Sequence, residues 1–206
     1  MSSVSSSWRR IDAWLAAHAP ATLAMLNPPA TPDALKSLCV RLPDELSESL
    51  TCHDGLKEWT SLLPEQTPLS ASGIAAHWRM RMEIAADIDG FVAVAPVGEP
   101  WWHPLWIPWA ESADGNAHVI DQRPGPGQGR LGWAVHDGVG DFSDSWPGLT
   151  AYLNDVAQAL YLGCGVRGMY PYLTCDGLLW WDFGTECRSI NGEPLLPAPV
   201  GVGGQG

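Results

Sequence analysis

Apolar residues recur at helical spacing in the first part of the chain and again near its middle. The stripe is clear in residues 8–18, which follow a run of serines able to cap a helix. Thr31 before Pro32 is a typical helix start, with proline in the first turn. The spacing predicts helices at about residues 8–18, 31–40, 43–54, 70–86 and 146–162.

Between the last two of these helices the apolar period changes from helical to extended. Pro104 and Pro108 exclude a helix from the run 101–110 and leave short extended pieces there. Strands are predicted at residues 91–97, 117–121 and 131–135. Helices followed by a meander and a closing helix predict an α+β fold with an antiparallel sheet.

The C-terminal part of the chain departs from this pattern. A hairpin is predicted over residues 169–182, with Cys175-Asp176-Gly177 as its turn. Residues 191–206 are rich in glycine and proline and are expected to form a loose, flexible tail. We therefore divide the chain into a main domain (1–162), an extension with the hairpin (163–190) and the tail (191–206).

Tryptophan is concentrated in the extended run. Trp101, Trp102, Trp106 and Trp109 are four of the 12 tryptophans in the chain. Alternation along a strand places Trp102 and Trp106 on one side and the other two on the opposite side, unless the prolines break the pattern. One side can be core while the other anchors a partner. Equally, the second strand of the C-terminal hairpin can cover the side that does not face the core. The sequence leaves open whether that side binds a partner or is covered by the hairpin.

An ordered set of sequence pieces resembles the SMI1/KNR4 family of the SUKH superfamily. Its centre is the strand WIPWA, a strand ending in Asp121, a Pro/Gly loop and the strand GWAV. The other pieces lie at residues 8–15, 26–30, 42–46, 53–55 and 62–64, in the helix containing Trp78, and in the closing helix. The resemblance covers about residues 8–162 and implies an α+β domain without enzymatic activity. Bacterial members resemble immunity proteins that bind and neutralise toxins, and fungal relatives are regulators linked to cell-wall synthesis.

The net charge of the chain limits the kinds of molecule that it can be expected to bind. The formal net charge is −12, from 23 acidic and 11 basic residues, whereas a nucleic-acid binder needs the opposite sign. Net acidity attracts basic surfaces and speeds encounter with them, although it also simply keeps a protein soluble. No apolar run approaches the roughly 20 residues that span a bilayer, and the polar N-terminus lacks an apolar signal core. We expect a cytoplasmic, acidic protein with no nucleic-acid or membrane partner.

No pattern of side chains points to catalysis, a metal or a cofactor. The six histidines contain no His-Glu-x-x-His pair. The five cysteines lack Cys-x-x-Cys spacing and are expected to be free thiols, several of them buried. The loop 125–129 is not followed by a helix, as a phosphate loop must be. We expect a protein that is not an enzyme, with an unrecognised hydrolase as a remaining alternative, because triads assemble from distant residues.

The resemblance implies, and the acidity supports, a protein-binding module of the immunity type, which neutralises a basic toxin domain encoded nearby; a nuclease is one such toxin. The alternative is a regulatory or scaffold protein linked to cell-wall synthesis or signalling. The residues predicted to contact a partner are Trp101, Trp102, His103, Asp121 and Arg123. For Asp121, pairing with Arg123 or Arg130 in the loop that follows is favoured over partner contact.

Overall fold

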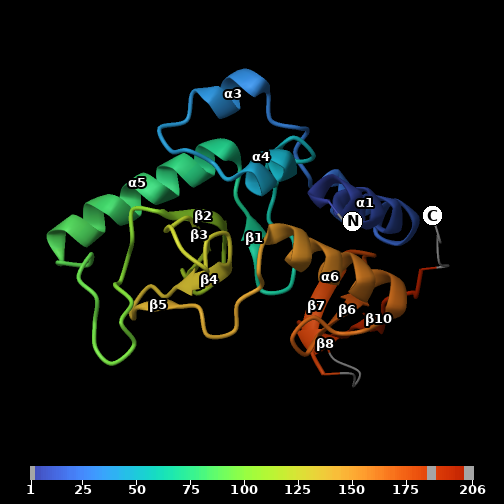
Figure 1. Cartoon of the computed structure of the whole chain (residues 1–206). Coiled ribbons are helices and arrows are strands. Elements are labelled where there is room, and N and C mark those ends of the chain that lie inside the picture. Colours follow the sequence, from blue (N-terminus) through green and yellow to red (C-terminus); the bar gives the residue numbers. More distant parts are fainter. Residues whose placement is uncertain (1–2, 185–188, 202–206) are drawn as a thin grey trace.

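The computed structural model describes residues 3–184 and 189–201. Its helices are α1 (Val4–His18), α2 (Pro20–Ala24), α3 (Pro32–Lys36), α4 (Asp44–Leu50), α5 (Ala71–Asp87) and α6 (Leu149–Leu162), as Figure 1 shows. The three long helices lie where the apolar stripes predict them. The Ser3 hydroxyl caps α1 by accepting from the Ser6 N–H, and the Ser70 hydroxyl caps α5 by accepting from the Gly73 N–H, each at 3.1 Å. Helix α3 is shorter than predicted because it buries no residue that could hold a further turn.

The centre of the molecule is an antiparallel sheet whose strands lie side by side in chain order. They are β1 (Thr67–Pro68), β2 (Trp106–Glu111), β3 (Ala117–Asp121), β4 (Leu131–Ala134) and β5 (Gly140–Asp141). Ile107 of β2 lies opposite Ile120 of β3, and the register shifts between Pro108 and Ala110. Trp109 is therefore the extra residue of a β-bulge, next to a proline that has no N–H for the ladder. The sheet and the helices confirm the predicted α+β fold.

Both faces of this sheet are buried, which explains why the tryptophan run is so apolar. Trp109 and Ile120 pack in the larger hydrophobic cluster, together with residues of α1, α4 and α6. Trp106 and Val119 face the opposite way, into a smaller cluster that includes Ala85 of α5. The prediction that Trp102 and Trp106 lie on the side opposite Trp109 is confirmed. Trp101 was predicted on the side of Trp109, and this is wrong, because it packs against the smaller cluster beside Trp102, before the strand begins.

Two glycines make room for aromatic rings on the smaller-cluster face. A Cβ added to Gly132, the first residue of the GWAV strand, would lie 2.2 Å from Cδ1 of Phe142. A Cβ on Gly140 would lie 2.2 Å from Cη2 of Trp106. Each ring therefore lies directly against backbone, and a larger residue cannot replace either glycine without displacing an aromatic side chain.

The C-terminal hairpin forms as predicted, from β6 (Met169–Leu173) and β7 (Leu179–Phe183). Two further short strands, β8 (Ser189–Ile190) and β9 (Glu193–Pro194), pair with each other. Figure 1 shows α6 lying over the hairpin. Leu179 and Trp181 belong to the same cluster as Trp109, so the extension completes the core of the main domain.

The segment after Asn191 differs from the expected loose tail. Strand β10 (Leu196–Pro197) pairs with β6, and Leu195 is fully buried. The Trp14 indole N–H donates to the carbonyl of Pro199 at 3.2 Å, which ties this segment to α1. Apolar docking and backbone pairing thus hold residues that composition alone assigned to a tail. Residues 202–206 of that predicted tail lie outside the described residues.

Residues 91–97 do not form the predicted strand. They belong to a long loop between α5 and β2, which projects beyond the end of the helix in Figure 1. The one pairing that the described residues show inside the loop is an isolated bridge between Val94 and Glu99. A strand needs a neighbour and a face to bury, whereas every residue from 91 to 98 is exposed. The β-branched composition that favoured a strand therefore misled the prediction.

Candidate functional site

Asp121 lies at the end of β3, only 2% exposed, between two arginines. Nε of Arg123 donates to Oδ1 of Asp121 at 2.8 Å, and its Nη2 donates to Oδ2 at 2.7 Å. Nε and Nη2 of Arg130 both donate to the same Oδ2 at 3.2 Å. Glu99 completes the group by accepting from Nη1 and Nη2 of Arg123 at 2.6 and 3.1 Å. We call these four residues the ion-pair network.

The ion-pair network is neutral overall and lies against aromatic rings. The Arg130 guanidinium is 4.3 Å from the ring centroid of Phe142, and that of Arg123 is 5.3 Å from the centroid of Trp106. Burial opposes ionisation of Asp121, but hydrogen bonds from the Arg123 side chain and backbone outweigh it and hold the pKa of Asp121 below its usual range. The hydrogen bond to Asp121 likewise raises the pKa of Arg123. Asp121 and Arg123 therefore satisfy each other and hold the Pro/Gly loop in place.

The three neighbouring candidates are also engaged inside the protein. Trp102 is 0% exposed and packs in the smaller cluster, so it presents no surface to a partner, and we do not retain it as an anchor. Trp101 is half-buried; its indole N–H donates to the carbonyl of His136 at 2.9 Å, and the Arg81 guanidinium lies 5.0 Å from its ring centroid. His103 is half-buried and its Nδ1 accepts from the Leu105 N–H at 3.0 Å. Burial, followed by the charge of Arg123, lowers the pKa of His103.

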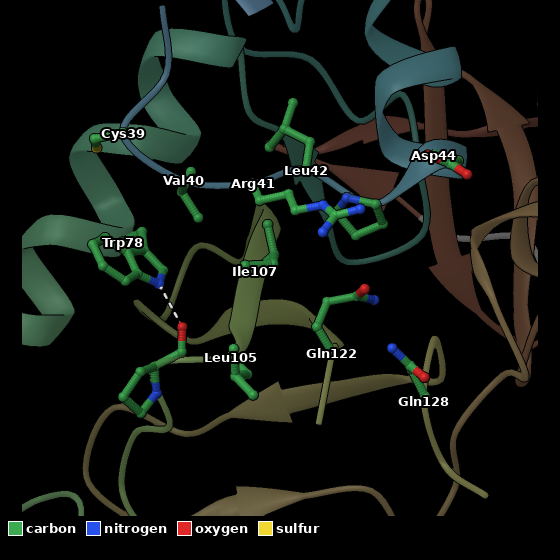
Figure 2. Close-up of a pocket in the computed structure, with 12 residues that line it drawn as sticks. Cys39, Val40, Arg41, Leu42, Asp44, Trp78, Leu105, Ile107, Gln122 and Gln128 are labelled. Carbon is green, nitrogen blue, oxygen red and sulfur yellow. Dashed lines mark hydrogen bonds between the residues drawn. The ribbon is translucent and has the colours of Figure 1, made fainter. Parts of the chain in front are cut away.

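A different surface offers free side chains. It is a groove of about 510 Å³ between the linker that precedes α4, helix α5, the start of β2 and the Pro/Gly loop. Figure 2 shows Trp78 on one side, with its indole N–H donating to the carbonyl of Pro104 at 3.0 Å. The lining residues are Cys39, Val40, Arg41, Leu42, Pro43, Asp44, Trp78, Pro104, Leu105, Ile107, Gln122 and Gln128.

The groove combines apolar contact area with unpaired polar groups. Leu105 at its edge is 42% exposed. Within the part of the chain that the structure describes, neither the Arg41 guanidinium nor the Gln128 amide has a hydrogen-bond partner, and both are exposed. In Figure 2 Arg41 comes from the linker, whereas Gln122 and Gln128 lie across the groove from it. An open channel with apolar walls and free amide and guanidinium groups can hold an extended polypeptide segment.

The groove does not bring together a nucleophile and a base. Cys39 is its one thiol, no histidine is among its twelve lining residues, and Cys39 Sγ accepts from Nη2 of Arg79 at 3.6 Å. A thiol needs a neighbouring base or a lowered pKa to act as a nucleophile. The lining residues can therefore bind a segment but do not form a reactive pair.

The clearest acid–base pair elsewhere has a structural role. Nε2 of His53 lies 2.9 Å from Oδ1 of Asp12, and its Nδ1 lies 3.3 Å from the carbonyl oxygen of Asn27. The ring also packs edge-on against Trp8. With both ring nitrogens bonded, His53 has none left to activate a nucleophile. It links α1 to the segment that follows α4.

Three further properties concern only the described residues, 3–184 and 189–201. No three His, Cys, Asp or Glu side chains gather where they could hold a metal ion. No helix is both long and apolar enough to cross a membrane. Cys39, Cys52, Cys164 and Cys175 are free thiols; three are exposed and Cys52 is half-buried, which corrects the expectation that several are buried. Cys187 lies outside this range.

Sequence reasoning missed the groove because its walls come from four separate segments. The helical spacing of Trp78 favours a core position, and the residue does pack against both clusters while one side lines the groove. Leu105 gave a usable signal, since an apolar residue directly after a proline in a turn has no strand or helix face to bury. Arg41 and Gln128 gave none, because a polar side chain in a linker is the ordinary case.

Comparison with known proteins gives two findings. The family model described as SMI1 / KNR4 family (SUKH-1) matches residues 29–155, a range that contains the groove and the ion-pair network. A relative from Schizosaccharomyces pombe (strain 972 / ATCC 24843), named "Cell wall biosynthesis/cell cycle regulator smi1", is 33% identical over 147 residues. That match covers 60% of the chain but only 29% of the relative, so the chain corresponds to less than a third of that protein.

Proposed function

Because the chain belongs to the SMI1/KNR4 family (SUKH-1), we propose that it is a non-enzymatic module that binds a protein partner in the groove. The observation that carries this proposal is the groove itself. It lies within the family-matched residues and joins an exposed Leu105 to the free Arg41 guanidinium and Gln128 amide. These groups suit the side chains and backbone of an extended segment. The groove supplies no nucleophile with a base, which supports binding over catalysis.

The partner class that we favour is a basic toxin domain, which the protein neutralises by covering it. A net charge of −12 attracts a positively charged surface and repels phosphate. A nuclease must carry a positively charged surface to bind its substrate, so an acidic protein can bind to that same surface. We place this encounter in the cytoplasm, where the exposed thiols of Cys39, Cys164 and Cys175 stay reduced.

A second candidate is a regulatory or scaffold role in cell-wall synthesis. The name of the fission yeast relative favours it. The chain matches less than a third of that relative, so the role would belong to a binding module shared between two differently built proteins. The two candidates share the groove and differ in the partner, which is a toxin in the first and a resident enzyme or signalling protein in the second.

The product of the adjacent gene is the probe that tests the proposal. We expect it to bind the purified chain and to lose affinity for the variants Arg41→Ala and Leu105→Asp. Arg9→Ala on α1 and Leu162→Asp at the end of α6 are matched controls, because Arg9 is exposed and Leu162 is 67% exposed, and neither lines the groove. A toxic product that the chain silences supports the immunity role, and a non-toxic product that binds the groove supports the regulatory role. Binding that is equal for the groove variants and their controls would reject the groove.

A further inference from the structure

The loop between α5 and β2 exposes an unusual amount of apolar surface. Val92 is 63% exposed, Val97 60%, Ile88 54% and Val94 49%, and Phe91 lies beside them. Every residue from 91 to 98 is exposed, and each is apolar or glycine. Single exposed apolar residues are common, but a continuous run of this kind marks an interaction surface. We call residues 88–98 the valine loop.

The valine loop is fixed at both ends. At its start, Gly90 donates to the carbonyl of Ala85 at 2.8 Å and accepts from the N–H of the fully buried Trp102 at 3.0 Å. At its end, Val94 donates to the Glu99 carbonyl at 3.1 Å, and the Glu99 side chain joins the ion-pair network. The apolar side chains are therefore presented in a defined arrangement, which lowers the ordering entropy that a partner must overcome.

Acidic residues lie at the N-terminal end of the valine loop, and lysine and arginine are missing from its sequence neighbourhood. Glu83, Asp87 and Asp89 are all exposed at the end of α5 and the start of the loop. Residues 82–122 contain no lysine or arginine at all. The acidic residues in that stretch are Glu83, Asp87, Asp89, Glu99, Glu111, Asp114 and Asp121, and of these Glu99 and Asp121 are paired with arginines.

Charge decides among three occupants that could cover such a loop. A second copy of the chain would bring a second set of the same acids, and like charges facing each other oppose association. A cellular membrane surface is anionic and repels the acidic rim, although valine and phenylalanine suit its interior. A basic protein with an apolar patch at the centre of its charged surface can pair its cations with the acidic residues and bury the valine side chains.

We propose that the valine loop is a docking surface for a basic protein, which buries Val92, Val94 and Val97 while its cationic side chains face Glu83, Asp87 and Asp89. The inference rests on the proposed function and adds the surface that slows dissociation of the complex. Charges at the rim govern the rate of encounter, whereas the apolar centre governs dissociation. The loop is distinct from the groove, since none of its residues lines it.

The first experiment is photo-crosslinking in the native host, with a photoreactive phenylalanine in place of Val94. Leu162, at the far end of α6 and 67% exposed, is the matched control position. We expect one protein adduct at position 94, of basic isoelectric point, and none at position 162. The adduct protein is then purified and its binding kinetics are measured. The double variant Val92→Asp/Val94→Asp should weaken its affinity about tenfold or more, mainly through faster dissociation, while Leu162→Asp leaves it unchanged.

The charged rim is tested with Asp87→Asn/Asp89→Asn. Asparagine tolerates the positive φ of 54° at Asp89 and removes only the charge. This variant should slow association and reduce its dependence on salt, while Asp176→Asn, an exposed acid in the hairpin turn, should not.

The inference is overturned by no adduct at position 94, by an adduct with a second copy of the chain or with an acidic protein, or by loop variants that bind like the wild type. Sedimentation with vesicles of phosphatidylserine and phosphatidylcholine that Val92→Asp/Val94→Asp abolishes would assign the loop to a membrane instead. If loop variants bind normally while Arg41→Ala does not, the loop inference fails and the proposed function stands. If no protein binds either surface, both fail.

Discussion

Glu99 and Arg123 join the exposed part of the structure to its interior. The carboxylate of Glu99, where the valine loop returns to the core, accepts two hydrogen bonds from the Arg123 guanidinium, at 2.6 and 3.1 Å. Arg123 in turn binds Asp121 at the end of β3. The loop is thereby anchored to the central sheet, and this anchoring holds its apolar side chains in place while they remain exposed.

Removal of the Asp121 carboxylate should destabilise the protein. In Asp121→Ala two partly exposed arginines lose the buried carboxylate that they share, while Arg123 keeps Glu99 as a partner. The expected loss is about 1–3 kcal/mol of unfolding free energy, the range for stranded donors. Chemical denaturation measures it. Asp137→Ala, at an aspartate with 76% of its side chain exposed, is the control and should stay within about 0.5 kcal/mol of wild type. An unchanged midpoint for Asp121→Ala together with lost partner binding would reverse our assignment.

The buried His118 and the half-buried His77 should make stability depend on pH well above the range of the carboxylates. Burial, followed by the charge of Arg167, lowers the pKa of His118 to about 3, and burial and Arg81 lower that of His77 to about 4. The unfolded chain protonates its histidines near pH 6.5. As the pH falls below about 6.5, these histidines therefore become protonated in the unfolded state but not in the folded state. The free energy of unfolding then declines with falling pH until the pH reaches the pKa of the folded state. Above about pH 6.5 this loss of stability is absent, because the histidines are neutral in both states.

Denaturation curves between pH 7.5 and pH 4.5 measure this decline. Replacement of one buried histidine, as in His118→Gln, should make the slope with pH shallower even if the protein is less stable at every pH. His136→Gln, at a half-exposed surface histidine, is the matched deletion and should keep the wild-type slope. Equal slopes for wild type and His118→Gln would show that His118 does not resist protonation in the folded state.

Gly140→Ala should cost about 1–3 kcal/mol of unfolding free energy, since overpacked cores lose stability in that range. The added methyl group would lie 2.2 Å from the Trp106 ring, which is fully buried and cannot swing away freely. Gly168→Ala tests backbone freedom without a clash, because nothing lies within 4 Å of its added Cβ and its φ is +81°. Thermal unfolding followed by tryptophan fluorescence reports both. A Gly140→Ala protein as stable as wild type, with unchanged emission, would contradict the packing described here.

The elements that local patterns specify were predictable, and those that depend on distant neighbours were not. Serine caps, the stripe of α5 and strands β3 and β4 follow from the residues themselves. The pairing of Asp121 with its loop arginines was also expected, since Arg123 is two residues away. Burial of Trp102 was not, because it depends on a cluster that Ala85 of α5 and Phe142, directly after β5, complete.

The valine loop shows the opposite error. Its alternating small apolar and β-branched residues predict a strand, and only the absence of a pairing neighbour for residues 91–93 and 95–98, among the residues described, makes it a loop. Likewise the C-terminal segment has the composition of a tail, yet Leu195 finds a fully buried site. Composition reports the conformation that a segment favours in isolation. The conformation of these two segments depends instead on the neighbouring elements that they contact or lack.

The central claim is that an acidic surface captures a basic protein. Surface-based kinetics with the purified partner, over a series of salt concentrations, test it most directly. The screening length falls from about 10 Å at 0.1 M salt to about 3 Å at 1 M. The account predicts an association rate that drops steeply across this range, with a dissociation rate that changes little. An association rate that is flat in salt would contradict it.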